Sequence, residues 1–400
     1  MLNLAVVYGS RACEHDVSIV TALQAMDNAD AAKYNIIPLY IAKDGRWFTG
    51  DALRRIEFYR DFDEKKAVEC RLAPQKGGKG VLLRWPEKKG FFGGGGGEIA
   101  VIDAALCALH GLNGEDGTIQ GLFELYDIPY TSAGVLGSSA GMDKIAMKLL
   151  YKGLGLPVLD MVWFLRQDFF ESPGERIAEI EAAFGYPCYV KPANLGSSIG
   201  ISKATDRESL KNAIEVAASY DKRILVERGV ENAKEVNCSA LGYGSEVRAS
   251  LCEMPVSWES FLTFEDKYLR GGKGEKGQKG QKAGSGMASL QRQLPAPIGE
   301  EKTKRIQELT CKMFKAMDLK GVVRVDFIID ASSDEVFVNE VNTIPGSLAF
   351  YLWEPLGMSY RTLIDELVRY AFAAQKDKEA SAFSFDSSIL EKANLGGAKK

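Results

Sequence analysis

The sequence predicts an α/β protein of two or three domains that begins with a parallel sheet. Its 400 residues are enough for two or three domains, and 46% of them are hydrophobic and 26% charged, as in ordinary globular proteins. Apolar strand-like runs alternate with helix patterns from Leu4 to Gly153. Strands that alternate with helices form parallel sheets, and ligands bind at the ends of such strands.

The N-terminal part supplies most of these elements. The expected strands are Leu4–Tyr8, Ile36–Ile41, Ile99–Leu109 and Ile128–Tyr130, and the expected helices are Val17–Met26, Thr118–Tyr126 and Lys144–Gly153. The first ten residues have no basic side chain and only a short apolar run, so we expect a strand there and not a signal peptide. The stretch from Gln75 to Gly97 is rich in glycine and lysine, which is typical of a flexible surface insertion without chemistry.

Two charged residues lie next to these elements. Glu14 lies in the turn after the first strand, where a parallel sheet places ligand contacts, although a helix-capping carboxylate is the simpler interpretation. Lys144 begins an expected helix. It is either an ordinary surface lysine or a phosphate contact near a helix N-terminus, whose free amides favour anions.

A hairpin with a polar face is predicted between Val322 and Gly346. Side chains alternate along a strand, so Arg324 and Asp326 share one face of its first strand, and Glu340 and Asn342 share one face of the second. Two carboxylates and an amide are hard oxygen ligands that suit Mg²⁺, and substrate phosphates commonly complete its shell. The alternative is a hairpin whose polar face is merely solvated.

A second pattern runs from Pro187 to Lys203. A strand ends in Lys191 and a Gly/Ser loop follows, in which small residues let backbone N–H groups approach phosphate oxygens. No Walker A motif is present, and a G-x-G-x-x-G match at Gly272 has no strand before it. The expected strand Arg223–Glu227 could present backbone groups to an adenine. Glu235 could bind ribose hydroxyls, although such a residue alone is more often a surface acid.

Several function classes are disfavoured by composition. A net charge of −4 lacks the excess of basic residues that is typical of nucleic-acid-binding proteins. No apolar run is long enough to span a bilayer. The seven scattered cysteines without C-x-x-C favour reduced thiols in a cytoplasm. A long stretch from Phe261 to Ala296 is typical of a lid, and it is poor in aromatics for a nucleic-acid arm. An amphipathic helix at Glu300–Leu319 and a last helix at Leu363–Ala374 are also expected.

As a set, these residues resemble the D-alanine–D-alanine ligases of the ATP-grasp superfamily. The matching stretches are CEHDVS, HGLNGEDGTIQG, IPYTSAGV, SSAGMDK, VKPANLGSSIGIS, ILVE, FEDKY, RVDF and NEVNTIPG, in the order of that family. The resemblance implies a three-domain α/β fold in which ATP lies between the central and C-terminal domains. We place the domains at 1–138, 139–232 and 233–375, followed by a polar tail at 376–400.

The resemblance also implies the reaction and its cofactors. ATP would activate the carboxylate of one D-alanine as an acyl phosphate, and the amine of a second D-alanine would attack it. The product is the dipeptide used in peptidoglycan. The implied cofactors are ATP and Mg²⁺, for which Mn²⁺ can substitute. The implied protein is a cytoplasmic homodimer that acts on small molecules, without nucleic-acid or membrane partners.

Roles for individual residues follow from the same resemblance. The implied Mg²⁺ ligands are Asp326, Glu340 and Asn342. The implied ATP contacts are Lys144, Lys191, Ser198, Glu227, Arg228, Val230, Glu235, Lys267 and Asn339. The implied catalytic residues are Glu14 for the ammonium of the first substrate, Ser197 and Tyr268 for ordering the lid with Glu14, and Arg324 and the backbone N–H of Gly346 for the oxyanion.

The chain departs from the family pattern in three places. Ser10 and Ala12 replace a glycine and a serine that usually precede the glutamate. A serine that often anchors the carboxylate of the second substrate is replaced by Tyr351. The lid is longer and richer in glycine and lysine than the family pattern, and it lacks the histidine that relatives using D-lactate often carry, which favours an amine acceptor. The alternatives are a D-alanine–D-serine or other D-amino acid ligase, and a nucleotide-binding regulatory protein on an inactive scaffold. No residue stands out as a base for the second amine.

Overall fold

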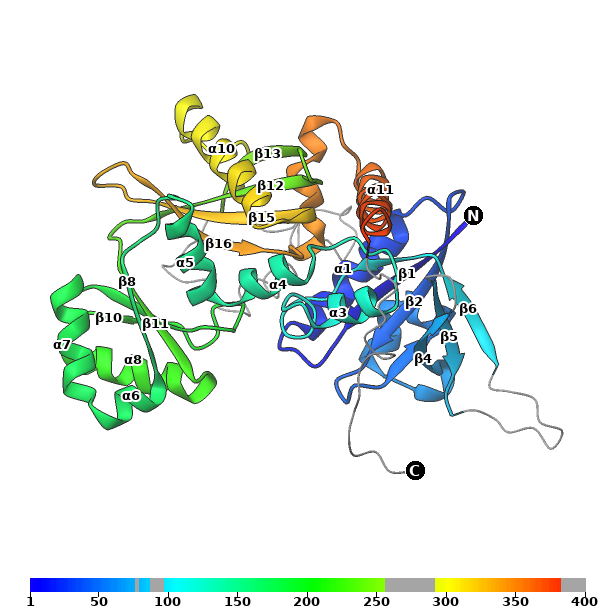
Figure 1. Ribbon diagram of the computed structural model, residues 1–400, viewed down its shortest axis with the longest axis horizontal. Coiled ribbons are helices and arrows are strands. Elements are labelled where there is room, and N and C mark those ends of the chain that lie inside the picture. Colours follow the sequence, from blue (N-terminus) through cyan, green and yellow to red (C-terminus); the bar gives the residue numbers. More distant parts are fainter. Residues whose placement is uncertain (76–78, 87–96, 256–291, 383–400) are drawn as a thin grey trace, which may run out of the picture.

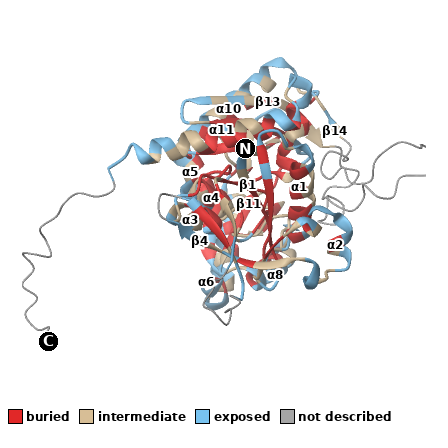
Figure 2. Cartoon of the chain, turned by 90° about the vertical axis from the view of Figure 1, so that its right-hand side faces the viewer, coloured by how far each residue is buried: buried red, intermediate tan, exposed pale blue. Residues whose placement is uncertain are grey.

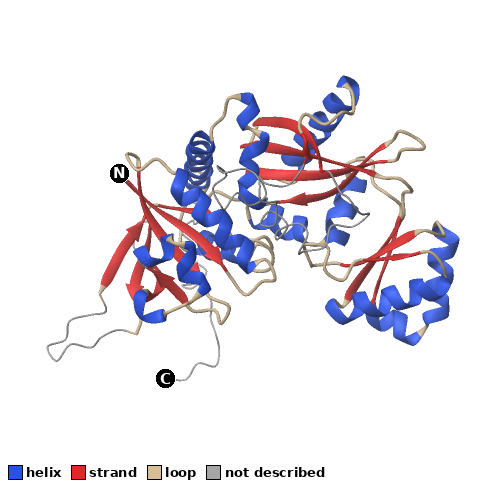
Figure 3. Cartoon of the chain, turned by 180° about the vertical axis from the view of Figure 1, so that it is seen from behind, coloured by secondary structure: helices blue, strands red, loops and turns tan. Residues whose placement is uncertain are grey.

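Three sheets organise the chain (Figure 1). The computed structural model describes residues 1–75, 79–86, 97–255 and 292–382. Seen from behind, the sheets form three groups of strands, each with helices packed beside it (Figure 3). The predicted α/β class is therefore confirmed. Among the described residues, no helix is both long enough and apolar enough to cross a membrane.

The N-terminal sheet has seven strands in the order β6-β5-β4-β3-β2-β1-β7. These strands are β1 (Leu2–Gly9), β2 (Tyr34–Ile41), β3 (Trp47–Thr49), β4 (Val68–Gln75), β5 (Lys79–Arg84), β6 (Glu98–Ile102) and β7 (Ala104–Cys107). Strand β1 pairs in parallel with β2 and β7, whereas the other pairs are antiparallel. The prediction of a parallel sheet is thus confirmed for β7, β1 and β2, and β3 to β6 extend this sheet with antiparallel pairs.

Three sequence-based expectations fail in this sheet. β5 occupies part of the stretch 75–97, which we expected to be an insertion, because Val81 and Leu82 enter the core between β4 and β6. The strand expected from 99 to 109 is divided at Asp103, whose carboxylate accepts hydrogen bonds from the backbone N–H of Asn3 and from Lys79. Residues 128–130 contribute a single bridge, from Tyr130 to Ala105, and no strand.

The described helices cover the sheets and connect them. They are α1 (His15–Asn28), α2 (Ile56–Arg60), α3 (Thr118–Leu125), α4 (Val135–Met142), α5 (Lys144–Gly153), α6 (Arg166–Glu171), α7 (Pro173–Ala183), α8 (Arg207–Tyr220), α10 (Glu300–Ala316) and α11 (Tyr360–Glu379), with the 3₁₀ helices η1 (Asp51–Arg54), η2 (Glu64–Lys66), η5 (Gly346–Leu352) and η6 (Glu354–Leu356). Figure 2 shows buried strands beneath helices whose outer faces are exposed.

Helix α11 continues beyond the place where we expected the polar tail to begin. It ends at Glu379, and Lys378 in its last turn pairs with Glu124 at 2.9 Å and with Asp127 at 2.8 Å. These ion pairs join the end of α11 to the end of α3. Basic residues in a last turn also interact favourably with the helix dipole.

One face of the central sheet packs in an apolar core, and the other face carries charged side chains. Its antiparallel strands are β8 (Met161–Leu165), β9 (Cys188–Pro192), β10 (Ser202–Ala204) and β11 (Arg223–Arg228), in the order β10-β9-β11-β8. Val190, Ile224 and Val226 pack with apolar side chains of α6, α7 and α8. Because side chains alternate along a strand, Lys191 and Glu227 lie on the opposite face. That face meets α5, where Ile145 packs against Leu225.

The C-terminal sheet contains the predicted hairpin. Its antiparallel strands are β12 (Lys234–Tyr243), β13 (Glu246–Pro255), β14 (Arg292–Gln293), β15 (Lys320–Ile329) and β16 (Val336–Asn342), in the order β14-β13-β12-β15-β16. Helix α10 covers the apolar face with Ile306, Leu309, Met313 and Phe314, which share one helix face at spacings of three and four residues. The predicted hairpin strands are thus confirmed, and their polar face is turned away from α10.

The segment η5 joins β16 to the rest of the molecule through a left-handed turn. Ser347, Leu348 and Ala349 have φ values of 53°, 51° and 50°. Each such residue costs about 1–2 kcal/mol because its Cβ crowds the following carbonyl oxygen. The side chains of all three are buried, and Leu348 and Ala349 belong to the large core of the N-terminal sheet, η5 and α11. Burial therefore offsets the strain.

Gly321 allows β15 to pass close to the chain at Thr131. Its φ is +77°, and a Cβ there would lie 2.0 Å from the carbonyl oxygen of Thr131. We expect Gly321→Ala to cost about 1–3 kcal/mol more in free energy of unfolding than Gly244→Ala. Gly244 has a φ of +58° but open space around it, so it matches the backbone strain without the clash. Urea unfolding of both variants measures the difference, and equal losses would contradict the close approach.

Candidate active site

Strands β15 and β16 place the predicted metal and oxyanion residues side by side. Asp326 lies opposite Glu340 and Arg324 lies opposite Asn342. Nε and Nη2 of Arg324 donate to the two oxygens of Asp326 at 2.7 and 2.8 Å, and Asn342 donates to Asp326 at 3.1 Å. Although burial opposes its charge, Asp326 holds the pKa of Arg324 well above its usual value. The guanidinium therefore stays charged beside the carboxylates.

A β-bulge determines which side chains of β16 lie on the polar face of the sheet. The register shifts between Asp326 and Phe327, so that Asn339 is the extra residue opposite them. Val338 and Val341, three residues apart, are consequently both buried in the core. Asn339 and Glu340 both remain on the polar side, and Asn339 accepts a hydrogen bond from Lys148 of α5 at 3.3 Å. Bulges near active sites often re-aim a side chain in this way.

The polar face continues across the whole sheet. Glu253, Asn237, Asp326 and Glu340 are successive partners on β13, β12, β15 and β16, and we call them the polar row. Strands lie about 4.8 Å apart, so the row spans roughly 14 Å. At the Glu253 end of the row, Arg292 of β14 and Tyr351 of η5 donate hydrogen bonds to Glu253 at 2.7 and 3.2 Å. Sequence reasoning missed Glu253, Asn237 and Arg292, although polar and buried apolar residues alternate around Asn237.

A cluster of lysines lies near the other end of the row, with Lys144 and Lys148 buried and Lys191 partly buried. Glu227 pairs with Lys148 at 2.5 Å and also with Lys191. Burial alone would raise the pKa of Glu227, but the two ammonium groups outweigh it and lower the pKa to about 2. Burial lowers the pKa of Lys148, whereas Glu227 outweighs burial and raises the pKa of Lys191; Glu340 acts in the raising direction on both. Sequence reasoning missed Lys148, which follows Lys144 by one helical turn.

Lys144 is buried at the start of α5, and its ammonium group donates to the carbonyl of Leu195 in the Gly/Ser loop. Burial lowers its pKa, and Glu340 opposes that shift. The expectation of free amides at this helix start is wrong, because the side chain of Asp143 accepts from the N–H groups of Ile145 and Ala146. A phosphate contact here would therefore depend on the lysine side chain.

Glu14 occupies the N-cap position of α1, but its carboxylate does not cap the helix. Its side chain makes no capping hydrogen bond, and its Oε1 instead accepts from the hydroxyl of Ser197 at 2.9 Å. A Cβ on Gly111 or Gly196 would approach its carboxylate to 2.1 or 2.8 Å, so both glycines provide room for it. Glu14 and Ser197 are 183 residues apart in sequence, and the fold nevertheless brings this predicted pair together.

The predicted adenine and ribose residues lie along β11 and at the start of β12. The carboxylate of Glu227 points into the lysine cluster, so an adenine could use only its backbone groups. Arg228 lies over the ring of Phe337 and 4.0 Å from Asp330, and Val230 is buried. Glu235 is exposed, and its charge raises the pKa of Lys191. Lys267 and Tyr268 lie outside the described residues.

A chain of buried hydrogen bonds holds the loop that carries Gly346. The N–H of Ser347 donates to Thr21 at 3.1 Å, Thr21 lies 2.7 Å from His110, and His110 lies 2.8 Å from the carbonyl of Ile344. That carbonyl can only accept, so Nδ1 of His110 donates to it and Nε2 accepts from Thr21. Burial lowers the pKa of His110 to about 4, which keeps the ring neutral.

The donor set fits a divalent cation and phosphates. Asp326 and Glu340 offer carboxylate oxygens from adjacent strands, and Asn342 offers an amide oxygen. No group of three His, Cys, Asp or Glu side chains in the described ranges could hold a metal. Asp326, Glu340 and Asn342 together supply fewer oxygens than the octahedral shell of Mg²⁺ takes, so substrate phosphates or water would supply the rest.

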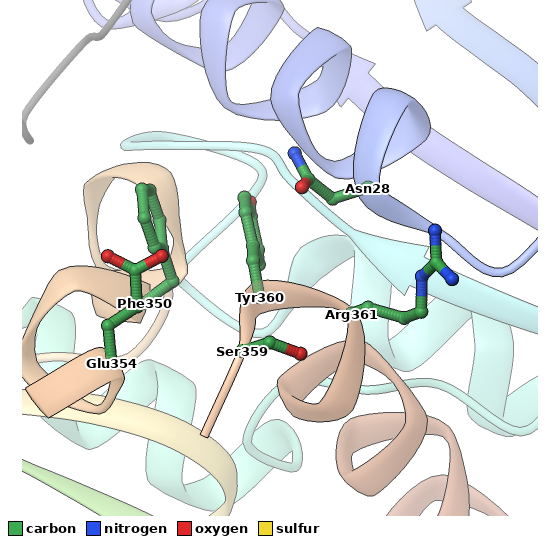
Figure 4. A pocket seen from close by; sticks show the side chains of 6 residues that line it. All are labelled: Asn28, Phe350, Glu354, Ser359, Tyr360 and Arg361. Carbon is green, nitrogen blue, oxygen red and sulfur yellow. The ribbon is translucent and has the colours of Figure 1, made fainter. Parts of the chain in front are cut away.

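The cavity shown in Figure 4 lies apart from these residues. Its volume is about 410 Å³, and it is lined by Asn28, Phe350, Glu354, Ser359, Tyr360 and Arg361. None of the predicted site residues is among them. Phe350 and Tyr360 stack there with their ring centroids 4.4 Å apart. The candidate site is therefore defined by the chemistry of its side chains and not by this cavity.

Glu115 ties two loops of the site together and should make stability depend on pH. Its carboxylate accepts from the N–H groups of Gly111 at 2.8 Å and Ile344 at 3.0 Å. Burial raises its pKa to about 7, and the charge of Glu14 acts in the same direction. The folded state thus binds the proton more tightly than the unfolded state. This stabilisation is fully present below the unfolded pKa and is lost as the pH rises through about 7.

Glu115→Gln cannot titrate, so the stability of the wild type relative to this variant should fall by roughly 3 kcal/mol between pH 4.5 and 7.5. Urea unfolding at a series of pH values measures the difference. Glu124→Gln is a control of opposite sign, because Lys378 and Tyr130 lower the pKa of Glu124 against the effect of burial. A difference for Glu115→Gln that does not change with pH would contradict the raised pKa.

Comparisons with known proteins agree on one family. A model of the D-Ala-D-Ala ligase N-terminus matches residues 3–133, and a model of the C-terminus matches residues 150–369. The D-alanine–D-alanine ligase of Thermosipho melanesiensis is 37% identical over 395 residues, which cover 98% of this chain and 99% of that protein. A D-alanine–D-alanine ligase of Thermoanaerobacter is 38% identical over 388 residues, which cover 94% and 98%.

Solved structures give the same result. The D-alanine–D-alanine ligase of Coxiella burnetii matches with a TM-score of 0.76 and 25% identity, and the match covers 95% of this chain and 98% of that one. The VanG D-Ala:D-Ser ligase of Enterococcus faecalis matches with a TM-score of 0.74 and 30% identity, over 92% and 99% of the two chains. Both family models and nearly full-length relatives thus agree, and the chain belongs to the D-alanine–D-alanine ligase family, with its ATP-grasp fold.

Proposed function

We propose that this chain is an ATP-dependent ligase that joins two molecules of D-alanine through a D-alanyl phosphate. Membership of the family supports the reaction class. The observation that carries the proposal for these residues is that Lys148, which shares Glu227 with Lys191, also donates to Asn339, the neighbour of Glu340 at one end of the polar row. Such an arrangement provides positive charge for phosphates directly beside carboxylates for a cation.

In the first step a carboxylate oxygen of D-alanine bonds to the γ-phosphorus of ATP, and the bond to the bridging oxygen breaks to release ADP. Both reactants are anions, so lysines that are partly shielded from water offset a large repulsion. A divalent cation held by Asp326, Glu340 and Asn342 would neutralise phosphate charge and orient the reacting oxygens. Lys144, through its bond to Leu195, would also hold the Gly/Ser loop over the phosphates.

The donor D-alanine would be oriented by Glu14. Its carboxylate is buried and lies beside Ser197 of the Gly/Ser loop, so an ammonium group bound there would be close to the phosphate side of the site. Ser197 fixes the carboxylate by its hydroxyl. We propose that Ser198, Arg228, Val230, Glu235, Lys267 and Asn339 contribute to the nucleotide site, and that Tyr268 closes over the substrate.

In the second step the amine of the acceptor attacks the acyl carbon, the bond to phosphate breaks, and the amine gives up a proton. Negative charge develops on the carbonyl oxygen. The guanidinium of Arg324 and the backbone N–H of Gly346 are the proposed donors to that oxygen. Losing one preorganised donor of this kind typically costs about 3–4 kcal/mol of barrier.

A D-alanine–D-serine ligase is the second candidate. It is favoured by the similarity to VanG, which is described as a D-Ala:D-Ser ligase, and by Tyr351 at the place of the expected serine. We propose D-alanine as the main acceptor because the D-alanine–D-alanine ligases of Thermosipho and Thermoanaerobacter are 37% and 38% identical to this chain. We also propose a cytoplasmic homodimer, in keeping with seven free thiols and a substrate that is a cytoplasmic nucleotide.

The proposed function is tested by phosphate release from ATP and Mg²⁺ with D-alanine, with L-alanine or without an amino acid, and with products identified by mass. We expect release only with D-alanine, with one phosphate for each D-alanyl-D-alanine. Release that requires added D-serine would favour the second candidate. Nucleotide binding without release under any condition would favour an inactive scaffold, and steeply salt-dependent binding to nucleic acid would favour a nucleic-acid protein.

Glu340→Gln should lower turnover at least about 100-fold, because it removes a proposed metal ligand whereas even indirect supports of such ligands are worth 10–100-fold. Unfolding stability should change by less than about 1 kcal/mol, since glutamine keeps the shape of the side chain and the residue is only partly buried. Glu335→Gln, in the turn of the same hairpin, is the matched control. Turnover like that of the wild type in Glu340→Gln would refute the metal assignment.

A further inference from the structure

Ser10 occupies a strained position directly after β1. Its φ is +88°, in the left-handed region that favours glycine, and the residue is only 1% exposed. Its backbone N–H donates to the carbonyl of Ile41 on the neighbouring strand β2 at 2.7 Å. A serine stands here in place of the second glycine of the family pattern. Strained residues of this kind persist only where the surrounding structure holds them, and they cluster at functional sites.

The hydroxyl of Ser10 joins two loops of the candidate site. It donates to the carbonyl of Leu112 at 3.1 Å, across 102 residues of sequence. Leu112 belongs to the loop between β7 and α3, and its neighbour Gly111 lies so close to Glu14 that a Cβ there would come within 2.1 Å of the carboxylate. The hydroxyl therefore ties the turn that leads to Glu14 to the loop that lies against the carboxylate of Glu14. A glycine at position 10 could not make this bond.

The carbonyl of Ser10 is held by His15. Nδ1 of His15 lies 2.6 Å from this carbonyl oxygen, and Nε2 lies 3.0 Å from the hydroxyl of Tyr40. A carbonyl oxygen can only accept, so Nδ1 donates to it and Nε2 accepts from Tyr40. Burial lowers the pKa of His15, which keeps the ring neutral near pH 7. Ser10 is thus bonded through its N–H, its carbonyl and its hydroxyl.

These bonds bear on Glu14 because the backbone of the same turn sets where its carboxylate points. Glu14 follows Ser10 by four residues, and its carbonyl accepts from the N–H of Ser18 in α1 at 3.0 Å. Its carboxylate, 7% exposed, meets the hydroxyl of Ser197 from the Gly/Ser loop after β9. The carboxylate therefore lies between the loop of Gly111 and the Gly/Ser loop, and the turn at Ser10 aims it there.

We propose that Ser10 is a positioning residue for the donor D-alanine, because its bonds to Leu112 and His15, which we call the Ser10 clamp, fix the turn and the loop on either side of Glu14. The proposal rests on the ligase function proposed above. Ser10 does not touch the substrate. A site that is fixed before binding avoids the loss of freedom that ordering two loops would cost, so the clamp strengthens binding of the donor. In the proposed reaction Glu14 contacts only the donor, and binding of the acceptor is therefore unaffected.

The test uses two variants that remove the hydroxyl but differ in strain. Ser10→Gly also relieves the left-handed strain, whereas Ser10→Ala keeps it, so Ser10→Ala should unfold at a lower urea concentration than Ser10→Gly. Hydroxylamine in excess traps the acyl phosphate as D-alanyl hydroxamate, and the dependence of this rate on D-alanine gives the KM of the donor. We expect this KM to rise about fivefold in both variants, the usual weight of one neutral hydrogen bond.

The KM of the acceptor distinguishes positioning from a general loss of structure. Initial rates of phosphate release without hydroxylamine, over a range of D-alanine concentrations, give this second KM, which should stay within about twofold of the wild-type value. A merely structural role for Ser10 would make the donor KM follow the loss of stability. The rise would then be larger in Ser10→Ala than in Ser10→Gly.

Hydrogen exchange measures the Ser10 clamp without any reaction. The backbone amides of residues 111–115 should exchange faster in Ser10→Gly than in the wild type, because their loop loses its bond to the turn after β1. Ser139→Ala is the matched control. The hydroxyl of Ser139 on α4 donates to the carbonyl of Asp116 at 2.8 Å, at the other end of the same loop. We expect both KM values of this control to equal those of the wild type.

The outcomes separate the two proposals. An active wild type whose donor KM is unchanged in both Ser10 variants, or rises only in Ser10→Ala, would overturn the role of Ser10 and leave the ligase function intact. Donor and acceptor KM values that rise together would do the same, and so would unchanged exchange of residues 111–115 in Ser10→Gly. A wild type that releases no phosphate with D-alanine would overturn the proposed function and, with it, the role of Ser10 in donor binding.

Discussion

The carboxylate of Glu227 has to be neutralised inside the protein, and much of the site follows from that requirement. It is 1% exposed and its partners come from α5 and β9. Breaking a buried pair by removing one partner typically costs about 3–5 kcal/mol, because the remaining charge stays uncompensated. Lys148 also reaches Asn339 on the bulge of β16. The contacts of Glu227 with Lys148 and Lys191, and of Lys148 with Asn339, therefore join the central sheet, α5 and the C-terminal sheet. They place lysines near Glu340.

A second constraint acts at the other end of the polar row. The left-handed turn of η5 is unfavourable for three residues that are not glycine, and it persists because its side chains are buried and its backbone is bonded through Thr21 and His110. Beyond the turn, Trp353 donates to Ser239 of β12 at 3.2 Å and Tyr351 to Glu253 of β13. The strained turn thus lays η5 on the polar face of the C-terminal sheet.

Local patterns predicted those parts of the site that lie within one strand or one turn. The alternation of Arg324 and Asp326 with buried Val323 and Val325 is confirmed by the structure. Asn237, Glu253 and Arg292 could not be found in this way, because they join the site only through the register of β12, β13 and β14. Register depends on which strands become neighbours, and that is a property of the whole sheet. Lys148 looked like any helix lysine until Glu227 was placed beside it.

The sequence by itself determined the α/β class, the family, the polar-faced hairpin and the Gly/Ser loop that follows Lys191, because each depends on residues close together in the chain. Only the tertiary structure decided that Glu14 bonds to Ser197 and does not cap its helix, that Lys148 shares Glu227 with Lys191, and that Tyr351 rests on Glu253 and Arg292. These contacts join residues far apart in sequence, and burial makes them strong by removing the competition of water.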